Sequence, residues 1–128
     1  MTPELSRILY VEDDPDIQAI AMMVLETISG FTVQACSSGK EALEKAVAFQ
    51  PDLILLDVMM PGMDGPETLK GLRNFLELQA TPVVFMTAKV QPQEVQGYIA
   101  LGAVGVIAKP FDPMTLAQEL RDIWARRE

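Results

Sequence analysis

Residues 53–57 read LILLD, four consecutive aliphatic side chains followed by a carboxylate. A short, wholly apolar run of this kind predicts a parallel strand that is covered on both faces. Four further runs predict strands at residues 7–12, 31–36, 82–87 and 104–108. The run at 31–36 alternates apolar and polar side chains, which favours a strand at the edge of the sheet.

Helical patterns separate these runs and follow the last of them. Apolar residues at helical spacing predict a helix that starts at Pro15, behind an Asp14 cap, and reaches Ile28 with a single apolar stripe. Four more helices are expected: from Ser38, over about 66–76, over about 92–101, and from Asp112-Pro113. This alternation favours an α/β fold, a doubly wound five-stranded parallel sheet with five helices on its two faces.

The composition limits what the chain can bind. A formal charge of −8 and a pI near 4.4 argue against direct binding to nucleic acid or to a membrane, and favour a cation or a basic protein surface. Cys36 is the single cysteine and there is no His, which excludes an intrachain disulfide, a cysteine-rich zinc site and imidazole catalysis. No segment is apolar over the length of a membrane span, so a cytoplasmic location is expected. No repeat or linker interrupts residues 1–128, which predicts a single domain.

Polar and charged residues follow the carboxyl ends of four predicted strands. They are Glu12, Asp13, Asp57, Thr87 and Lys109. In an open parallel sheet these ends meet at the edge where ligands bind, so the five side chains should share one crevice. Grouped carboxylates suit Mg²⁺, and without the ion Asp13 and Asp57 would raise each other's pKa.

This set of groups fits phosphoryl transfer, which depends on positioning and on charge neutralisation. Asp57 would be the nucleophile and would form an acyl phosphate. Lys109 would contact one phosphoryl oxygen as a point charge, and Thr87 would hydrogen-bond another. The sequence therefore predicts a phosphoacceptor site built around Asp57.

Four motifs, in this order and spacing, resemble the response-regulator receiver domain of two-component signal transduction. They are VEDDPD at 11–16, LILLDVMMPGMDG at 53–65, FMTA at 85–88 and IAKPF at 107–111. The similarity extends over about residues 7–124. It implies a flavodoxin-like three-layer sandwich with strand order 2-1-3-4-5, the order known for the chemotaxis member of the family.

The resemblance also implies a reaction and its participants. Asp57 would accept a phosphoryl group from a histidine kinase or a histidine phosphotransfer protein, and the domain would promote only its own phosphorylation and dephosphorylation. Mg²⁺ would be held by Asp13, Asp57 and the backbone carbonyl of Met59, with Glu12 acting mainly through water. The peptide bond before Pro110 would be cis, which would aim Lys109 into the site.

The resemblance further implies an output surface on the fourth helix, the fifth strand and the fifth helix, biased by movement of Thr87 and used to bind a downstream protein. Two features depart from the family pattern. Val106 occupies the position of the usual switch aromatic, so the coupling to Thr87 is weaker or uses other atoms. Residues 102–106 also lack the acidic pair and Tyr of the DNA-binding subfamily, so that subfamily's dimer is not expected and the chain should be a monomer or a weak dimer.

Two positions bear on the lifetime of the phosphorylated state. Met59 and Lys89 lie two residues after Asp57 and Thr87, where family members tune that lifetime. A methionine side chain cannot orient a water molecule, so slow self-hydrolysis is expected.

Three other functional classes are weighed against a phosphoacceptor. A dehalogenase-like phosphatase would need a second acid two residues after Asp57, where Met59 stands. A flavin binder would need a phosphate loop after the first strand, where the carboxylates of 12–14 would repel phosphate. An inert receiver used only for binding would not need Asp13, Asp57, Thr87 and Lys109 together. The chain is expected to be either a stand-alone regulator or a segment of a hybrid kinase or larger regulator.

Overall fold

The computed structural model describes residues 3–127 as a five-stranded sheet flanked by helices. The strands are β1 (Arg7–Val11), β2 (Thr32–Cys36), β3 (Leu53–Asp57), β4 (Val83–Thr87) and β5 (Gly105–Ala108). The helices are α1 (Pro15–Met22), α2 (Gly39–Phe49), α3 (Gly65–Leu72), α4 (Pro92–Ala100) and α5 (Leu116–Arg126), with a π-helical segment η1 (Met23–Ile28) and a short 3₁₀ helix η2 (Leu76–Leu78). All five predicted strands are present, and their ends agree with the predicted ranges to within one residue.

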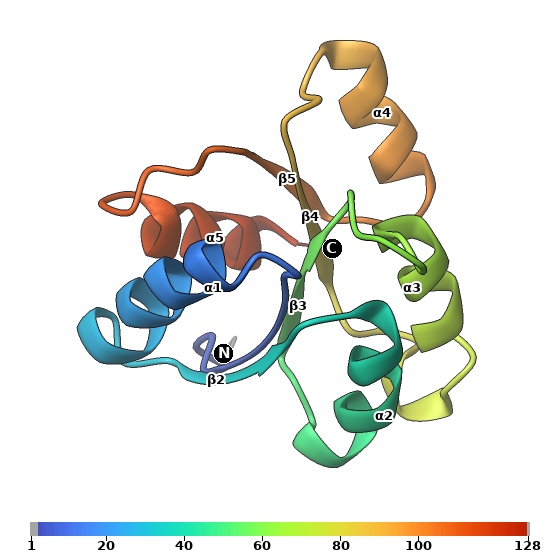
Figure 1. Ribbon diagram of the computed structural model, residues 1–128, viewed down its shortest axis with the longest axis horizontal. Coiled ribbons are helices and arrows are strands. Elements are labelled where there is room, and N and C mark those ends of the chain that lie inside the picture. Colours follow the sequence, from blue (N-terminus) through green and yellow to red (C-terminus); the bar gives the residue numbers. More distant parts are fainter. Residues whose placement is uncertain (1–2, 128) are drawn as a thin grey trace.

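The strands pair in parallel in the order β2-β1-β3-β4-β5, which confirms the predicted doubly wound fold. β2 lies at an edge, as its alternating pattern predicted. In Figure 1, α1 and α5 lie on one side of the sheet and α2 and α3 lie on the other. The direction of winding reverses between β1 and β3, and in such folds the crevice at the carboxyl ends of these strands binds ligands.

Successive side chains of the central strands enter two separate cores. Tyr10, Leu55 and Met86 pack with α1, η1 and α5 in one core, whereas Leu56 and Phe85 pack with α2 and α3 in the other. Every residue of β3 and β4 is buried, because helices cover both faces of these strands. The alternation determines on which side of the sheet a side chain at a strand end will lie.

The first helix differs from the predicted single stripe. The Asp14 carboxylate caps α1 as predicted, but the helix widens into a π turn, in which the Ser29 N–H bonds to the Val24 carbonyl at 3.0 Å. A π turn rotates the residues that follow it away from the 3.6-residue pattern. Ile28 is 71% exposed and Ile20 is 47% exposed, so the predicted stripe is wrong at both residues.

Two helix boundaries also differ from the predicted ones. α3 ends at Leu72 rather than near 76, because the Arg73 guanidinium donates to the carbonyls of Leu78 and Thr81, both at 2.7 Å, and so holds the following segment against the helix end. α5 begins at Leu116 rather than at residue 113, since Asp112 organises a preceding turn through its carboxylate and carbonyl. Local capping residues alone did not indicate either boundary.

The helices of the described part of the chain are short. The longest, α2 and α5, have 11 residues each, and none of the helices within residues 3–127 has the length and apolar character required to cross a bilayer.

Candidate functional site

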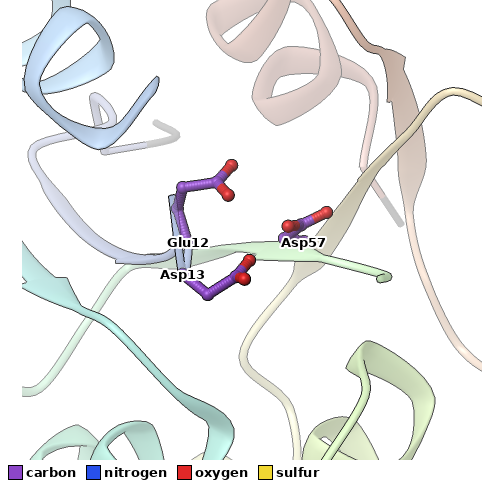
Figure 2. Close-up of side chains that lie close together, drawn as sticks. All are labelled: Glu12, Asp13 and Asp57. Atoms are coloured by element: carbon purple, nitrogen blue, oxygen red, sulfur yellow. The ribbon is translucent and has the colours of Figure 1, made fainter. Parts of the chain in front are cut away.

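Three carboxylates meet at the carboxyl ends of β1 and β3. Glu12, Asp13 and Asp57 each place a carboxylate oxygen within 4.8 Å of the others, so the structure brings these three predicted residues together. Glu12 is 1% exposed and Asp57 is 2% exposed, whereas Asp13 is more open to solvent. Figure 2 shows Glu12 and Asp13 on opposite sides of the end of β1, with Asp57 on the neighbouring strand.

The alternation of the strands explains which carboxylate meets the lysine. Asp57 follows Leu55 on the side of the sheet that faces α1 and α5. The Glu12 N–H bonds to the Cys36 carbonyl of β2, and the Lys109 N–H bonds to the Thr87 carbonyl of β4, so each residue continues its strand by one position. Both lie on the same side of the sheet as Tyr10 and Ile107, two positions before them. The Lys109 ammonium therefore bridges the two acids, with its Nζ 2.9 Å from Glu12 Oε1 and 3.2 Å from Asp57 Oδ2. Asp13 lies on the other side of β1.

The remaining predicted residues border this cluster. Thr87 is buried at the end of β4, and its Oγ1 accepts a hydrogen bond from the Lys89 N–H at 3.1 Å. Met59 lies two residues beyond Asp57 with its side chain 65% exposed, and its backbone carbonyl stays a predicted metal ligand. The peptide bond between Lys109 and Pro110 is cis, as the resemblance implied.

The family model of the response regulator receiver domain matches residues 8–121, nearly the whole chain, and with them all four strand ends of the site. The chain belongs to this family. Receiver domains of this family are signalling domains, and membership supports a role in phosphorelay signalling.

Curated relatives extend beyond the receiver domain. The chain is 38% identical over 122 residues to the alkaline phosphatase synthesis transcriptional regulatory protein PhoP of Bacillus subtilis, covering 95% of this chain and 50% of the relative. It is 34% identical over 122 residues to the response regulator Rre1 of Synechocystis, covering 94% of this chain and 52% of the relative. The chain thus spans about half the length of the curated relatives that it matches.

Solved receiver structures match over their full length. The chemotaxis response regulator CheY4 of Vibrio cholerae superposes with a TM-score of 0.85 at 34% identity, covering 93% of this chain and 98% of that chain. The signal receiver domain of a signal transduction histidine kinase from Syntrophus aciditrophicus gives a TM-score of 0.79 at 31% identity, covering 96% of this chain and 95% of that chain. Similar receivers therefore occur both as separate regulators and within kinases.

Charge and burial act strongly on the central acid of this receiver domain. Burial first and then the charge of Glu12 raise the pKa of Asp57, the charge of Lys109 opposes both, and the net result is a pKa of about 6. The carboxylate whose charge raises the pKa of Asp57 is Glu12, not Asp13 as the sequence had suggested. Burial works against the Lys109 ammonium, but its hydrogen bond to Glu12 and the charges of both acids prevail and raise its pKa.

The raised pKa of Asp57 predicts that the metal-free protein loses stability as the pH rises. Because the folded pKa of about 6 exceeds the ordinary 3.8, Asp57 contributes stability that is complete below about pH 4 and is lost as the pH rises through about 6. The free energy of unfolding of the wild type should fall relative to Asp57→Asn by on the order of 2 kcal/mol over this range. Chemical denaturation of both proteins without divalent cations tests this, and a pH-independent difference would contradict it.

Two residues near the site were not among the predicted site residues. A side chain at Gly65 would place a Cβ 2.6 Å from the Asp57 carbonyl oxygen, and the Gly65 N–H bonds to the Val58 carbonyl at 2.8 Å. Glycine is therefore required for α3 to begin against the end of β3. Its position directly after the Asp64 cap was an available signal. The second residue is Tyr10, whose spacing of two from Glu12 placed it on the same side of the strand.

Proposed function

We propose that this receiver domain accepts a phosphoryl group on Asp57 from the phosphohistidine of a histidine kinase or a histidine phosphotransfer protein, in a Mg²⁺-dependent reaction. The main support is the arrangement of Asp57, which is buried beside a lysine that reaches two acids at once. The transfer would switch a surface formed by α4, β5 and α5. The proposal takes residues 1–128 as one domain acting in the cytoplasm as a monomer or weak dimer, without direct contacts to nucleic acid or membrane.

The residues have distinct roles in this transfer. A carboxylate oxygen of Asp57 attacks phosphorus, the phosphorus–nitrogen bond breaks, the electron pair of that bond stays on the imidazole nitrogen, and an acyl phosphate forms. Lys109 leaves the two acids and donates to one phosphoryl oxygen, since the incoming group carries more negative charge than either carboxylate. The Thr87 hydroxyl, which only accepts a hydrogen bond from Lys89 here, is free to donate to another phosphoryl oxygen.

The oxygen ligands at the strand ends suit a small divalent cation. Asp13, Asp57 and the backbone carbonyl of Met59 would hold Mg²⁺, with Glu12 acting through water, and this all-oxygen set is the kind that Mg²⁺ prefers. The bound ion would supply charge neutralisation for the phosphoryl oxygens. Three carboxylates so close together would otherwise repel an anionic donor.

The output surface has a loosely attached helix. None of the residues of α4 is buried, and its Ile99 is 45% exposed. Tyr98 of α4 packs on Phe85 of β4, two residues before Thr87, with ring centroids 5.3 Å apart. Val106 is half-buried in β5 and has no aromatic ring that could change its rotamer. These features support a switch in which movement of Thr87 changes how α4 lies on the sheet.

Incubation with a small phosphodonor, acetyl phosphate, and Mg²⁺ tests the proposal by mass spectrometry and phosphate release. We expect the gain of one phosphoryl group, located at Asp57. Repeated turnover of the donor would instead support a phosphatase-type enzyme. An unmodified chain would support an inert interaction module. Transfer from a phosphorylated histidine phosphotransfer domain would then test the physiological donor.

Replacing Met59 by Asn should shorten the lifetime of the phosphorylated protein. The methionine two residues after Asp57 is exposed and its side chain cannot orient a water, whereas an amide can, so hydrolysis should accelerate about tenfold. The backbone carbonyl is retained in the variant. Met114 is 90% exposed in the loop before α5, so Met114→Asn serves as the matched control. Loss of the phosphoryl group is followed by mass spectrometry, and a wild-type half-life of seconds would contradict slow self-hydrolysis.

A further inference from the structure

The Tyr10 hydroxyl is buried without a hydrogen-bond partner. Tyr10 is 0% exposed in β1, and within residues 3–127 its hydroxyl is the only buried side-chain nitrogen or oxygen that lacks a partner. Leaving such a group unpaired costs free energy, and phenylalanine would fill nearly the same space without that cost. An orphaned hydroxyl in an otherwise paired interior calls for a physical explanation.

The position of Tyr10 connects it to the acidic site. It precedes Glu12 by two residues on the side of β1 that faces α1 and α5, the side on which Glu12 meets Lys109. A tyrosine hydroxyl is protonated at neutral pH and can donate one hydrogen bond. The Tyr10 hydroxyl is therefore a buried donor on the same side of β1 as the Glu12 carboxylate.

Glu12 already accepts hydrogen bonds from other donors. Its Oε1 accepts from Lys109 Nζ at 2.9 Å, and its Oε2 accepts from the Asp14 N–H at 3.2 Å. Phosphorylation would draw the Lys109 ammonium to the phosphoryl oxygens. The buried Glu12 carboxylate would then lose the direct hydrogen bond at its Oε1, and the Mg²⁺ of the proposed function would reach it only through water, so another direct donor would stabilise it.

We propose that Tyr10 is a positioning residue for Glu12, and that its hydroxyl donates to the Glu12 carboxylate once Lys109 has moved to the phosphoryl group. This inference rests on the proposed function, because it concerns the loaded site. In the structure the Glu12 Oε1 is engaged by Lys109, and the Tyr10 hydroxyl has no partner. This exchange of donors keeps the Glu12 carboxylate hydrogen-bonded and oriented both before and after phosphorylation.

The test compares Tyr10→Phe with the wild type in two states. Without ligands, the melting temperature of Tyr10→Phe should be no lower than that of the wild type, since the removed hydroxyl is unpaired. With Mg²⁺ and beryllofluoride as the phosphoryl mimic, calorimetric titration should show binding weakened about tenfold, the loss expected for a hydrogen bond to a charged group. In a Glu12→Ala background, Tyr10→Phe should cause no further weakening.

Thr68→Val is the matched control. The Thr68 hydroxyl is also buried, but its Oγ1 donates to the Asp64 carbonyl at 2.7 Å. This variant should therefore lower the melting temperature of the ligand-free protein, in contrast to Tyr10→Phe.

The outcomes distinguish this inference from the proposed function. Wild-type binding of Mg²⁺ and beryllofluoride together with equal binding by Tyr10→Phe overturns the inference alone. A lower ligand-free melting temperature for Tyr10→Phe, with no selective loss in the loaded state, assigns Tyr10 a purely structural role and also overturns it. A wild-type chain that binds neither Mg²⁺ nor beryllofluoride overturns the proposed function, and the inference falls with it.

Discussion

Replacing Asp57 by Asn abolishes phosphoryl uptake, the largest effect that we expect. The amide has nearly the same shape as the carboxylate but is not a nucleophile toward phosphorus, so no acyl phosphate can form. The folded structure should be retained and even stabilised at neutral pH, because the replaced carboxylate is 2% exposed and its pKa is raised by burial and by Glu12. Incubation with acetyl phosphate and Mg²⁺, followed by mass spectrometry, measures the loss.

Asp16→Asn is the matched control for this experiment. Asp16 is exposed in the first turn of α1, close in sequence to the acidic site but outside it. Phosphoryl uptake should stay at the wild-type level in this variant. Full uptake by Asp57→Asn would place the modification on another residue and refute the proposed phosphoacceptor.

Replacing Lys109 by Met should impair both folding stability and phosphoryl transfer. The Lys109 ammonium is the counter-charge of two acids that are 1% and 2% exposed, and removing one member of a buried ionic cluster leaves uncompensated charge. We expect the free energy of unfolding of the metal-free protein at neutral pH to fall by about 3 kcal/mol. The deficit should shrink when Asp57 is protonated at lower pH or when Mg²⁺ is added. The rate of phosphoryl uptake should fall about a hundredfold, since one charged donor to the transferred group is lost.

Lys45→Met provides a comparison of the same substitution at an exposed pair. Lys45 Nζ lies 2.7 Å from Glu41 Oε2, a shorter contact than either contact of Lys109, but the pair lies on the surface of α2. No measurable change in stability or uptake is expected, because solvent screens such a pair. Equal destabilisation by the two variants would show that burial does not govern the strength of the Lys109 cluster.

The sequence predicted the elements and the position of the site because both depend on local patterns. The apolar run 53–57 predicted a buried strand and the alternation in 31–36 predicted an edge strand, as found. Polar residues at the ends of four predicted strands marked one edge of the sheet, since parallel strands end together there. The helix ends at Leu72 and Leu116 were missed, because hydrogen bonds to the following segment and within the preceding turn set them.

The sequence by itself determined that a doubly wound sheet gathers acids, a threonine and a lysine at its carboxyl edge. Only the tertiary structure decided how these groups are paired. Lys109 meets Glu12 across a separation of 97 residues, and Asp13, adjacent in sequence, lies on the other side of the strand. It is also the tertiary structure that leaves the Tyr10 hydroxyl without a partner. The physical reason is that periodicity fixes the side of a strand on which a residue lies, whereas a hydrogen bond depends on distances between segments that come together only on folding.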